Sequence, residues 1–185
     1  GAVSVPVTVI DYGIGNLRSA QKALEHVGAD AHLTTDADVV AEADGVVLPG
    51  VGAFGRCREE LARTGLDEVA LDAISAGQPF LGICVGMQLL YEASDETPGV
   101  AGLGVLSGAV RRLPDSVKRP QMQWNQLDVT VPSPLFDGIG DRPWMYFVHS
   151  LHGVPTDPAV VAATCEYGGA VNAAFRQGTV FATQF

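Results

Sequence analysis

The sequence predicts an α/β fold, with an open and mostly parallel sheet, helices on both faces and antiparallel additions. Up to about Gly102, short β-branched apolar runs alternate with segments whose apolar residues recur at helical spacing. Beyond that point, shorter alternating segments follow one another and are separated by Gly, Asp and Pro-Ser-Pro turns. This second pattern is typical of antiparallel strands, so we expect such strands to flank a parallel core.

The N-terminal part begins with the apolar run 5–11, which is typical of a buried strand and breaks at Tyr12-Gly-Ile-Gly15. Asn16 can cap the next helix, whose apolar positions recur up to Val27 before Gly28 ends it. The further strands expected in this part are 31–34, 45–48 and 79–83, and the further helices are 38–43, 56–63, 66–76 and 87–92.

The C-terminal part is expected to contain only strands and turns. With 185 residues, of which 47% are apolar and 17% charged, the chain has enough apolar material for one core. No repeat, linker or low-complexity stretch divides it, so we expect a single domain over residues 1–185. The expected strands are 109–113, 126–131, 145–149, 160–165, 171–175 and 179–183.

Composition excludes several classes of protein. The net charge of −10 argues against nucleic-acid binding, because polyphosphate recognition needs clustered Lys and Arg. No apolar run approaches the ~18 residues that span a bilayer, and the N-terminus lacks the pattern of a signal peptide. Three irregularly spaced cysteines do not form a disulfide framework. We therefore expect a cytoplasmic protein with no membrane contact.

Cys84 is the strongest candidate for a catalytic residue. It lies in Gly82-Ile-Cys-Val-Gly86, where a predicted strand gives way to a helix, which is the context of a nucleophile elbow. Glycines two residues to either side would relieve crowding around a strained backbone. The helix N-terminus would favour the thiolate, and the N–H of Val85 could stabilise an oxyanion. The same five-residue pattern can also contain an inert buried cysteine, but the flanking strand and helix favour the interpretation of Cys84 as a nucleophile.

The turn Pro49-Gly-Val-Gly52 also follows a buried strand. Loops at the carboxyl ends of parallel strands converge on one crevice, and glycine-rich turns can present N–H groups to a negative charge. This turn is therefore expected to form the second half of an oxyanion hole. Cys57 and Cys165 lack such a context and are expected to be packing residues.

These segments resemble those of class I (triad) glutamine amidotransferases, and more narrowly those of the glutaminase subunits of imidazole glycerol phosphate synthases. The resemblance runs in family order along nearly the whole chain. The segments that carry it are Asp11-Tyr-Gly-Ile-Gly-Asn-Leu17, Leu48-Pro-Gly-Val-Gly-Ala-Phe54, Leu81-Gly-Ile-Cys-Val-Gly-Met-Gln-Leu-Leu90, Pro120-Gln-Met-Gln-Trp-Asn125, Tyr146-Phe-Val-His-Ser150 and Ala182-Thr-Gln-Phe185.

The resemblance implies a glutaminase of histidine biosynthesis that uses no cofactor and no metal. Cys84 would attack the glutamine amide, form a thioester and release ammonia to a cyclase subunit of (β/α)₈-barrel type. Its implied residue roles are an oxyanion hole at Val51, Gly52 and Val85, substrate contacts at Gln88 and Ser150, and a partner interface at Asn16, Trp124 and Tyr146.

Three departures from the family pattern bear on these roles. In the family, His-Pro-Glu supplies the base and its orienting residue directly after the segment that ends here at Phe185. We expect the domain to be cut short before that motif, and a chain without it to have negligible turnover. Neither His149 nor His152 is expected to replace the base. Gln123 stands where the family usually has Gly, and Leu151 where it often has Tyr.

Two other functions remain open from the sequence, a different triad amidotransferase and a non-catalytic binding subunit with the same fold. For a glutaminase subunit, we expect ammonia release to be gated by its partner. The glycines of Gly50–Gly52 lower the barrier to rotating a peptide. In the free subunit, we expect this loop to present a carbonyl to Cys84 rather than the N–H of Val51.

Overall fold

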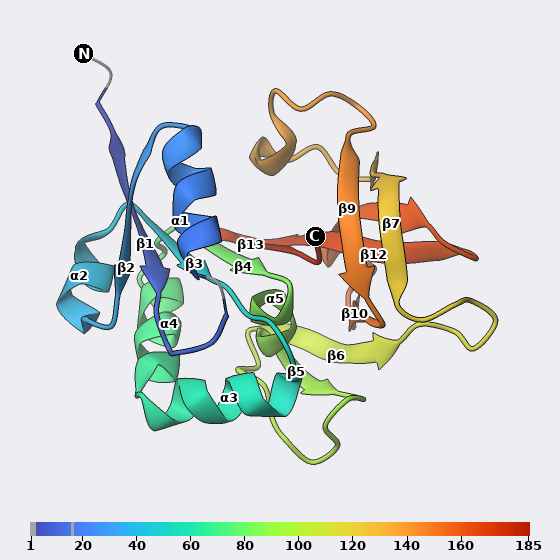
Figure 1. Cartoon of the computed structure of the whole chain (residues 1–185), viewed down its shortest axis with the longest axis horizontal. Coiled ribbons are helices and arrows are strands. Elements are labelled where there is room, and N and C mark those ends of the chain that lie inside the picture. Colours follow the sequence, from blue (N-terminus) through green and yellow to red (C-terminus); the bar gives the residue numbers. More distant parts are fainter. Residues whose placement is uncertain (1–2, 16) are drawn as a thin grey trace.

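The computed structural model describes residues 3–15 and 17–185, and its largest feature is an eight-stranded sheet (Figure 1). The first five strands in its spatial order are parallel to one another, and the last three are antiparallel additions. This confirms the predicted fold class. In spatial order the strands are β2 (Ala29–Thr34), β1 (Val5–Ile10), β3 (Gly45–Leu48), β4 (Phe80–Ile83), β13 (Val180–Thr183), β12 (Ala170–Gln177), β11 (Val161–Glu166) and β8 (Asp128–Val129).

Two smaller sheets lie beside the C-terminal part of the large one (Figure 1). One contains β10 (Leu151–Pro155), β6 (Leu106–Arg112) and β5 (Tyr91–Ser94), and the other pairs β7 (Gln121–Gln126) with β9 (Trp144–His149). The helices are α1 (Leu17–His26), α2 (Ala37–Glu42), α3 (Phe54–Arg63), α4 (Leu66–Ser75) and α5 (Val85–Leu89), with short 3₁₀ turns η1 (Pro134–Phe136) and η2 (Pro158–Val160).

Alternate residues of the parallel strands bury two different faces, because successive side chains of a strand point in opposite directions. On one face, Val9 and Val47 pack with Leu17 of α1. On the other, Ile10 and Leu48 lie in the main core with residues of α2 to α5. Helices therefore cover both faces, as the sequence predicts. Within the described residues, no helix is long and apolar enough to cross a membrane.

The predicted helix 87–92 is wrong at its end, and the strands β5, β7 and β10 are not expected from the sequence. The helix stops at Leu89. The residues that follow form β5 instead, because pairing with β6 satisfies their backbone hydrogen-bonding groups. The predicted strand 126–131 contains only the last residue of β7 and the two residues of β8. Asn16, expected to cap α1, lies outside the described residues.

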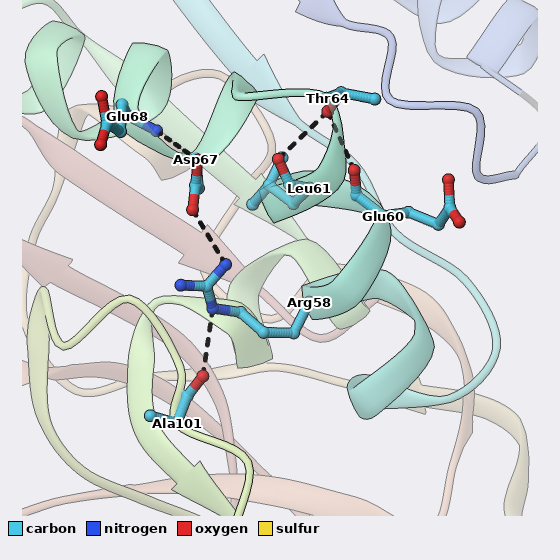
Figure 2. Close-up of polar contacts among 7 residues, drawn as sticks. All are labelled: Arg58, Glu60, Leu61, Thr64, Asp67, Glu68 and Ala101. Atoms are coloured by element: carbon cyan, nitrogen blue, oxygen red, sulfur yellow. Dashed lines mark hydrogen bonds and ion pairs between the residues drawn. The ribbon is translucent and has the colours of Figure 1, made fainter.

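Arg58 connects three segments at the corner between α3 and α4 (Figure 2). Its Nε donates to the carbonyl of Ala101 at 3.1 Å, and its Nη1 lies 3.1 Å from the Asp67 carboxylate. Both side chains of this ion pair are largely buried, with 23% and 17% exposure. Nearby, the Thr64 hydroxyl donates to the carbonyls of Glu60 and Leu61 at the end of α3. The corner thus anchors the loop that follows β5.

We expect Arg58→Ala to lower the free energy of unfolding by about 1–3 kcal/mol, because it leaves a largely buried carboxylate and a carbonyl without their donor. Arg63→Ala is the matched control, since the Arg63–Glu60 pair lies on the surface one turn further along the same helix. Urea denaturation of both variants measures the difference. Equal unfolding midpoints for the two would contradict an anchoring role for Arg58.

Candidate active site

Cys84 occupies a strained turn between β4 and α5. Its backbone has φ 54° and ψ −119°, and it is the one non-glycine residue with positive φ in the described part of the chain. A non-glycine residue there is held by its surroundings at an energetic cost. The Cys84 N–H donates to the carbonyl of Thr183 at 2.8 Å, which extends the pairing of β4 with β13. The predicted strained turn between a strand and a helix is confirmed, and the nucleophilic role of Cys84 stays a prediction.

Both neighbouring glycines are required by close backbone contacts. A Cβ at position 86 would lie 1.9 Å from the carbonyl oxygen of Leu48, and one at position 82 would lie 3.0 Å from the Cα of Met87. No side chain larger than hydrogen fits at Gly86 without moving the end of β3. The glycines therefore relieve crowding, as predicted, and they also bring the elbow against the loop that follows β3.

The Cys84 side chain borders a pocket of about 380 Å³ at the carboxyl ends of β3 and β4. The structure brings together there every catalytic, oxyanion-hole and substrate-binding residue that the sequence predicts. These residues are Cys84, Val51, Gly52, Val85, Gln88 and Ser150. In the described ranges, no group of three or more His, Cys, Asp or Glu side chains could hold a metal ion.

The Cys84 thiol is predominantly neutral in this arrangement. Burial raises its pKa, and its Sγ lies 3.1 Å from the carbonyl oxygen of Gln184, to which the S–H donates. The expectation that the helix N-terminus favours the thiolate is therefore not met here. The physical reason is that α5 has only five residues, while burial and a carbonyl acceptor both favour the protonated form.

The loop after β3 contacts the elbow through a backbone carbonyl. The N–H of Val85, a predicted oxyanion donor, donates to the carbonyl of Gly50 at 3.3 Å and is therefore not available to another acceptor in this structure. The carbonyl of Val51 accepts a hydrogen bond from the Cys57 thiol at 3.1 Å. This arrangement matches the expectation that the loop presents a carbonyl to the elbow.

Gln88 lines the pocket and has a buried hydrogen-bond acceptor that is not used. Its side chain is buried on α5, and its Nε2 donates to Oε1 of Gln184 at 3.2 Å. The Oε1 of Gln88 is buried and has no partner among the described residues. Since a buried acceptor without a donor is destabilising, this atom is suited to receive an N–H from a bound molecule.

Glu96 is a pocket residue that the sequence analysis missed. Its Oε2 accepts from the N–H of Phe54 at the start of α3 at 3.1 Å, and its side chain borders the same pocket as Cys84. A carboxylate in this position can hold an ammonium group of a ligand. It lies in the turn Ser94-Asp-Glu-Thr97 and belongs to no recognisable motif, so no sequence signal separates it from the adjacent acidic residue Asp95.

The two histidines near the pocket have structural contacts. The ring of His149 borders the pocket and lies 2.7 Å from the carbonyl of Leu151 and 2.7 Å from Oε1 of Gln121. His152 accepts from the N–H of Asn172 at 3.1 Å. Burial lowers the pKa of both, that of His152 to about 4 with a further contribution from His149. In the described structure, neither histidine forms a hydrogen bond with Cys84, which agrees with the expectation that neither is the base.

The β7–β9 sheet carries an exposed apolar surface near the mouth of the pocket. Trp124 and Tyr146 lie next to each other, with ring centroids 5.5 Å apart, and are 64% and 49% exposed. Trp144, Met122 and Val148 on the same two strands are also exposed, and the last two also border the pocket. Asn16, the third predicted interface residue, lies outside the described residues.

Comparison with known proteins identifies the class to which this fold and pocket belong. Residues 8–185 match the family model "Glutamine amidotransferase class-I". A solved glutamine amidotransferase superposes with a TM-score of 0.76 at 22% identity, covering 97% of this chain and 88% of that one. The PurLQS structure from Thermotoga maritima gives 0.74 at 23% identity, with 98% and 86% covered. The chain belongs to the class I glutamine amidotransferases.

Sequence identity narrows this family further. The imidazole glycerol phosphate synthase subunit HisH of Syntrophotalea carbinolica is 47% identical over 186 residues, covering 97% of this chain and 90% of the relative. The same subunit of Methanothermobacter thermautotrophicus is 46% identical over 179 residues, with 97% and 88% covered. Within the class, this chain belongs to the HisH family.

We expect a glutamine-analogue inactivator to alkylate Cys84 alone in the full-length protein, because among the cysteines of the described chain only Cys84 borders the pocket. Cys84→Ala should remove the label, whereas Cys165→Ala should retain one label per chain, since Cys165 is fully buried elsewhere. Intact-mass measurement gives the stoichiometry. Labelling that persists in Cys84→Ala would refute the assignment of the nucleophile.

Proposed function

We propose that this chain is the glutaminase subunit of an imidazole glycerol phosphate synthase in histidine biosynthesis. It hydrolyses glutamine to glutamate and passes ammonia to a cyclase subunit of (β/α)₈-barrel type. The observation that carries the proposal is the strained Cys84 elbow beside a pocket that Gln88 lines, whose buried side-chain oxygen has no hydrogen-bond partner among the described residues. Three free cysteines agree with a reducing, cytoplasmic location.

The reaction begins with attack of the Cys84 sulfur on the side-chain amide carbon of glutamine. The S–H proton passes to a base, which returns a proton to the nitrogen as the C–N bond breaks and ammonia leaves. Water then cleaves the thioester, giving glutamate and the free thiol. The oxyanion of each tetrahedral intermediate needs the N–H groups of Val85 and of the Val51–Gly52 turn.

We place the missing base and its orienting acid directly after Phe185, in the same amidotransferase domain. β13 lies parallel to β4, with Thr183 opposite Ile83, and the carbonyl of Gln184 is 3.1 Å from the Cys84 sulfur. Consecutive Cα atoms are only ~3.8 Å apart, so a residue after Phe185 begins close to the nucleophile. A histidine there would deprotonate the thiol that burial keeps neutral.

The pocket can distinguish the two ends of glutamine. The free Oε1 of Gln88 can accept an N–H of the substrate, and Ser150 borders the same space. The Glu96 carboxylate can pair with the α-ammonium group, which any amino-acid substrate carries. These contacts would hold the amide carbon near Cys84 in an orientation fit for attack.

Gating follows from the contact between the Gly50 carbonyl and the Val85 N–H. Rotation of the Gly50–Val51 peptide would remove the Gly50 carbonyl from the Val85 N–H and direct the Val51 N–H toward Cys84. Loss of one oxyanion-hole donor typically lowers the rate ~10²–10³-fold, so one peptide rotation gives gating of useful size. We assign the signal for this rotation to the cyclase subunit with its own substrate bound.

The test is glutamate release by the full-length protein, alone and with the cyclase subunit and its nucleotide ligand. We expect stimulation of about 10²-fold or more, because the partner restores at least one oxyanion donor. Gly50→Ala should be inactive in both conditions, since its Cβ would lie 2.7 Å from the N of Gly86. Equal wild-type rates with and without the partner would contradict gating and favour a free-standing glutaminase.

The exposed apolar surface on β7 and β9 is the proposed docking site for the cyclase. Trp124 and Tyr146 belong to the residue types that supply most binding energy at interfaces, and the strands that carry them border the pocket. Docking there would place the partner beside the exit of ammonia. Asn16 is proposed to lie toward the same partner on the basis of the family resemblance alone.

We expect Trp124→Ala to weaken the complex by about 2 kcal/mol or more, because it removes a large exposed aromatic anchor. Val154→Ala is the control, since Val154 is exposed on the separate strand β10. Titration calorimetry of the full-length variants with the cyclase subunit measures both. Unchanged affinity in Trp124→Ala would exclude this surface as the centre of the interface.

A further inference from the structure

The three consecutive carbonyls of the loop after β3 have three different partners. The Tyr12 hydroxyl donates to the carbonyl of Pro49 at 2.5 Å, and the Cys57 thiol donates to the carbonyl of Val51 at 3.1 Å. Between them, the carbonyl of Gly50 accepts from the N–H of Val85 at 3.3 Å. The two outer carbonyls are thus bound by side chains, and the central one is bound only by the elbow.

The two side chains come from different elements and are completely enclosed. Tyr12 lies two residues after the end of β1 and is 1% exposed, and Cys57 lies on α3 and is 0% exposed. Burial raises the pKa of the phenol and of the thiol, and both groups donate to carbonyls of the same three-residue turn. Both therefore keep their protons and remain hydrogen-bond donors.

This arrangement determines which motion the loop can make. A peptide can rotate about the line joining its two Cα atoms while both neighbouring peptides stay in place, because only one dihedral on each side of it changes. Tyr12 and Cys57 hold the two neighbouring peptides, and the ring of Pro49 restricts φ at the first of these residues. With both neighbours held, rotation of the Gly50–Val51 peptide has to be taken up by ψ of Gly50 and φ of Val51 alone. It would carry the β-branched Val51 to a positive φ, which it does not have in this structure, so fixed neighbours oppose the rotation.

We propose that Tyr12 and Cys57 are positioning residues that clamp the loop on both sides of its rotating peptide and hold the oxyanion hole closed in the free subunit. The inference rests on the proposed glutaminase function. It assigns part of the regulation to two residues that line neither the substrate pocket nor the surroundings of the Cys84 sulfur. Tyr12 also bounds the space around Gly50, where an added Cβ would lie 2.9 Å from its hydroxyl oxygen.

The clamp predicts a loss of gating when either donor is removed. One neutral hydrogen bond changes an equilibrium roughly 3–10-fold, so Tyr12→Phe and Cys57→Ala should each raise the rate of the full-length subunit alone by about that factor. The rate with the cyclase subunit and its ligand should stay within about twofold, because the partner then holds the open loop. The ratio of stimulated to basal rate should therefore fall, with the KM for glutamine unchanged.

Two matched variants separate the clamp from simple packing. Cys57→Ser keeps a donor at the same position and should restore the wild-type ratio. Tyr91→Phe removes the hydroxyl of another buried tyrosine, one without a partner among the described residues, and should leave the ratio unchanged. An unchanged ratio in both Tyr12→Phe and Cys57→Ala would overturn the proposal, as would a rise in KM with the ratio preserved.

Amide hydrogen exchange gives a readout that does not depend on activity. If the clamp holds the Gly50 carbonyl on the elbow, the Val85 N–H should exchange about 3–10-fold faster in Cys57→Ala than in the wild type or in Cys57→Ser. Equal exchange in all three would overturn the clamp even for an active enzyme. Absence of glutaminase activity in the wild type with its partner would instead refute the proposed function, and the exchange measurement would still decide the clamp.

Discussion

The close approach between Gly86 and the end of β3 is the contact on which the rest of the site depends. A Cβ at position 86 would meet the Leu48 carbonyl, so the first turn of α5 can lie directly against the backbone that leads into the glycine loop. This contact brings the Val85 N–H within reach of the Gly50 carbonyl. It also fixes Cys84 between that loop and β13, in a backbone conformation that an isolated peptide would rarely adopt.

From this contact the two functions of the loop follow together. The N–H groups that stabilise an oxyanion and the carbonyl that blocks it belong to the same few residues, because every residue carries one donor and one acceptor. A site built in this way needs no lid to be inactive. The pocket beside Cys84 is open in this structure, and in the proposed mechanism the rotation of one peptide is enough to start the reaction.

The sequence was sufficient to predict those parts of the structure that depend on local residue patterns. The apolar run, cysteine and glycines at 79–86 specify the elbow, since the run forms β4 and the two glycines are needed where backbones approach closely. The strand with which a segment pairs can lie far away in the sequence, and for this reason β7 and β10 were not predicted. Glu96 escaped for a related reason, because its place in the pocket comes from the hydrogen bond to Phe54, 42 residues away in sequence.

The protonation state of Cys84 could not be predicted from its sequence context either. A helix follows the cysteine as expected, but its length and the burial of the sulfur are properties of the folded chain. The departures at Gln123 and Leu151 are accommodated differently. Gln123 is exposed on β7, whereas Leu151 is buried and contacts His149 through its backbone carbonyl, which a change of side chain leaves in place.

The position of β13 has a consequence for how the protein is made. This strand, which is near the C-terminal end of the described chain, inserts between β4 and β12, and the contact from Cys84 to Gln184 joins residues 100 positions apart. Contacts of such long range form late, because the entropy of closing a long loop must be lost first. On the ribosome, the segment that carries the thiol emerges well before the strand that completes its surroundings. A nascent chain therefore cannot complete the surroundings of Cys84 until β13 has been synthesised and has paired with β4.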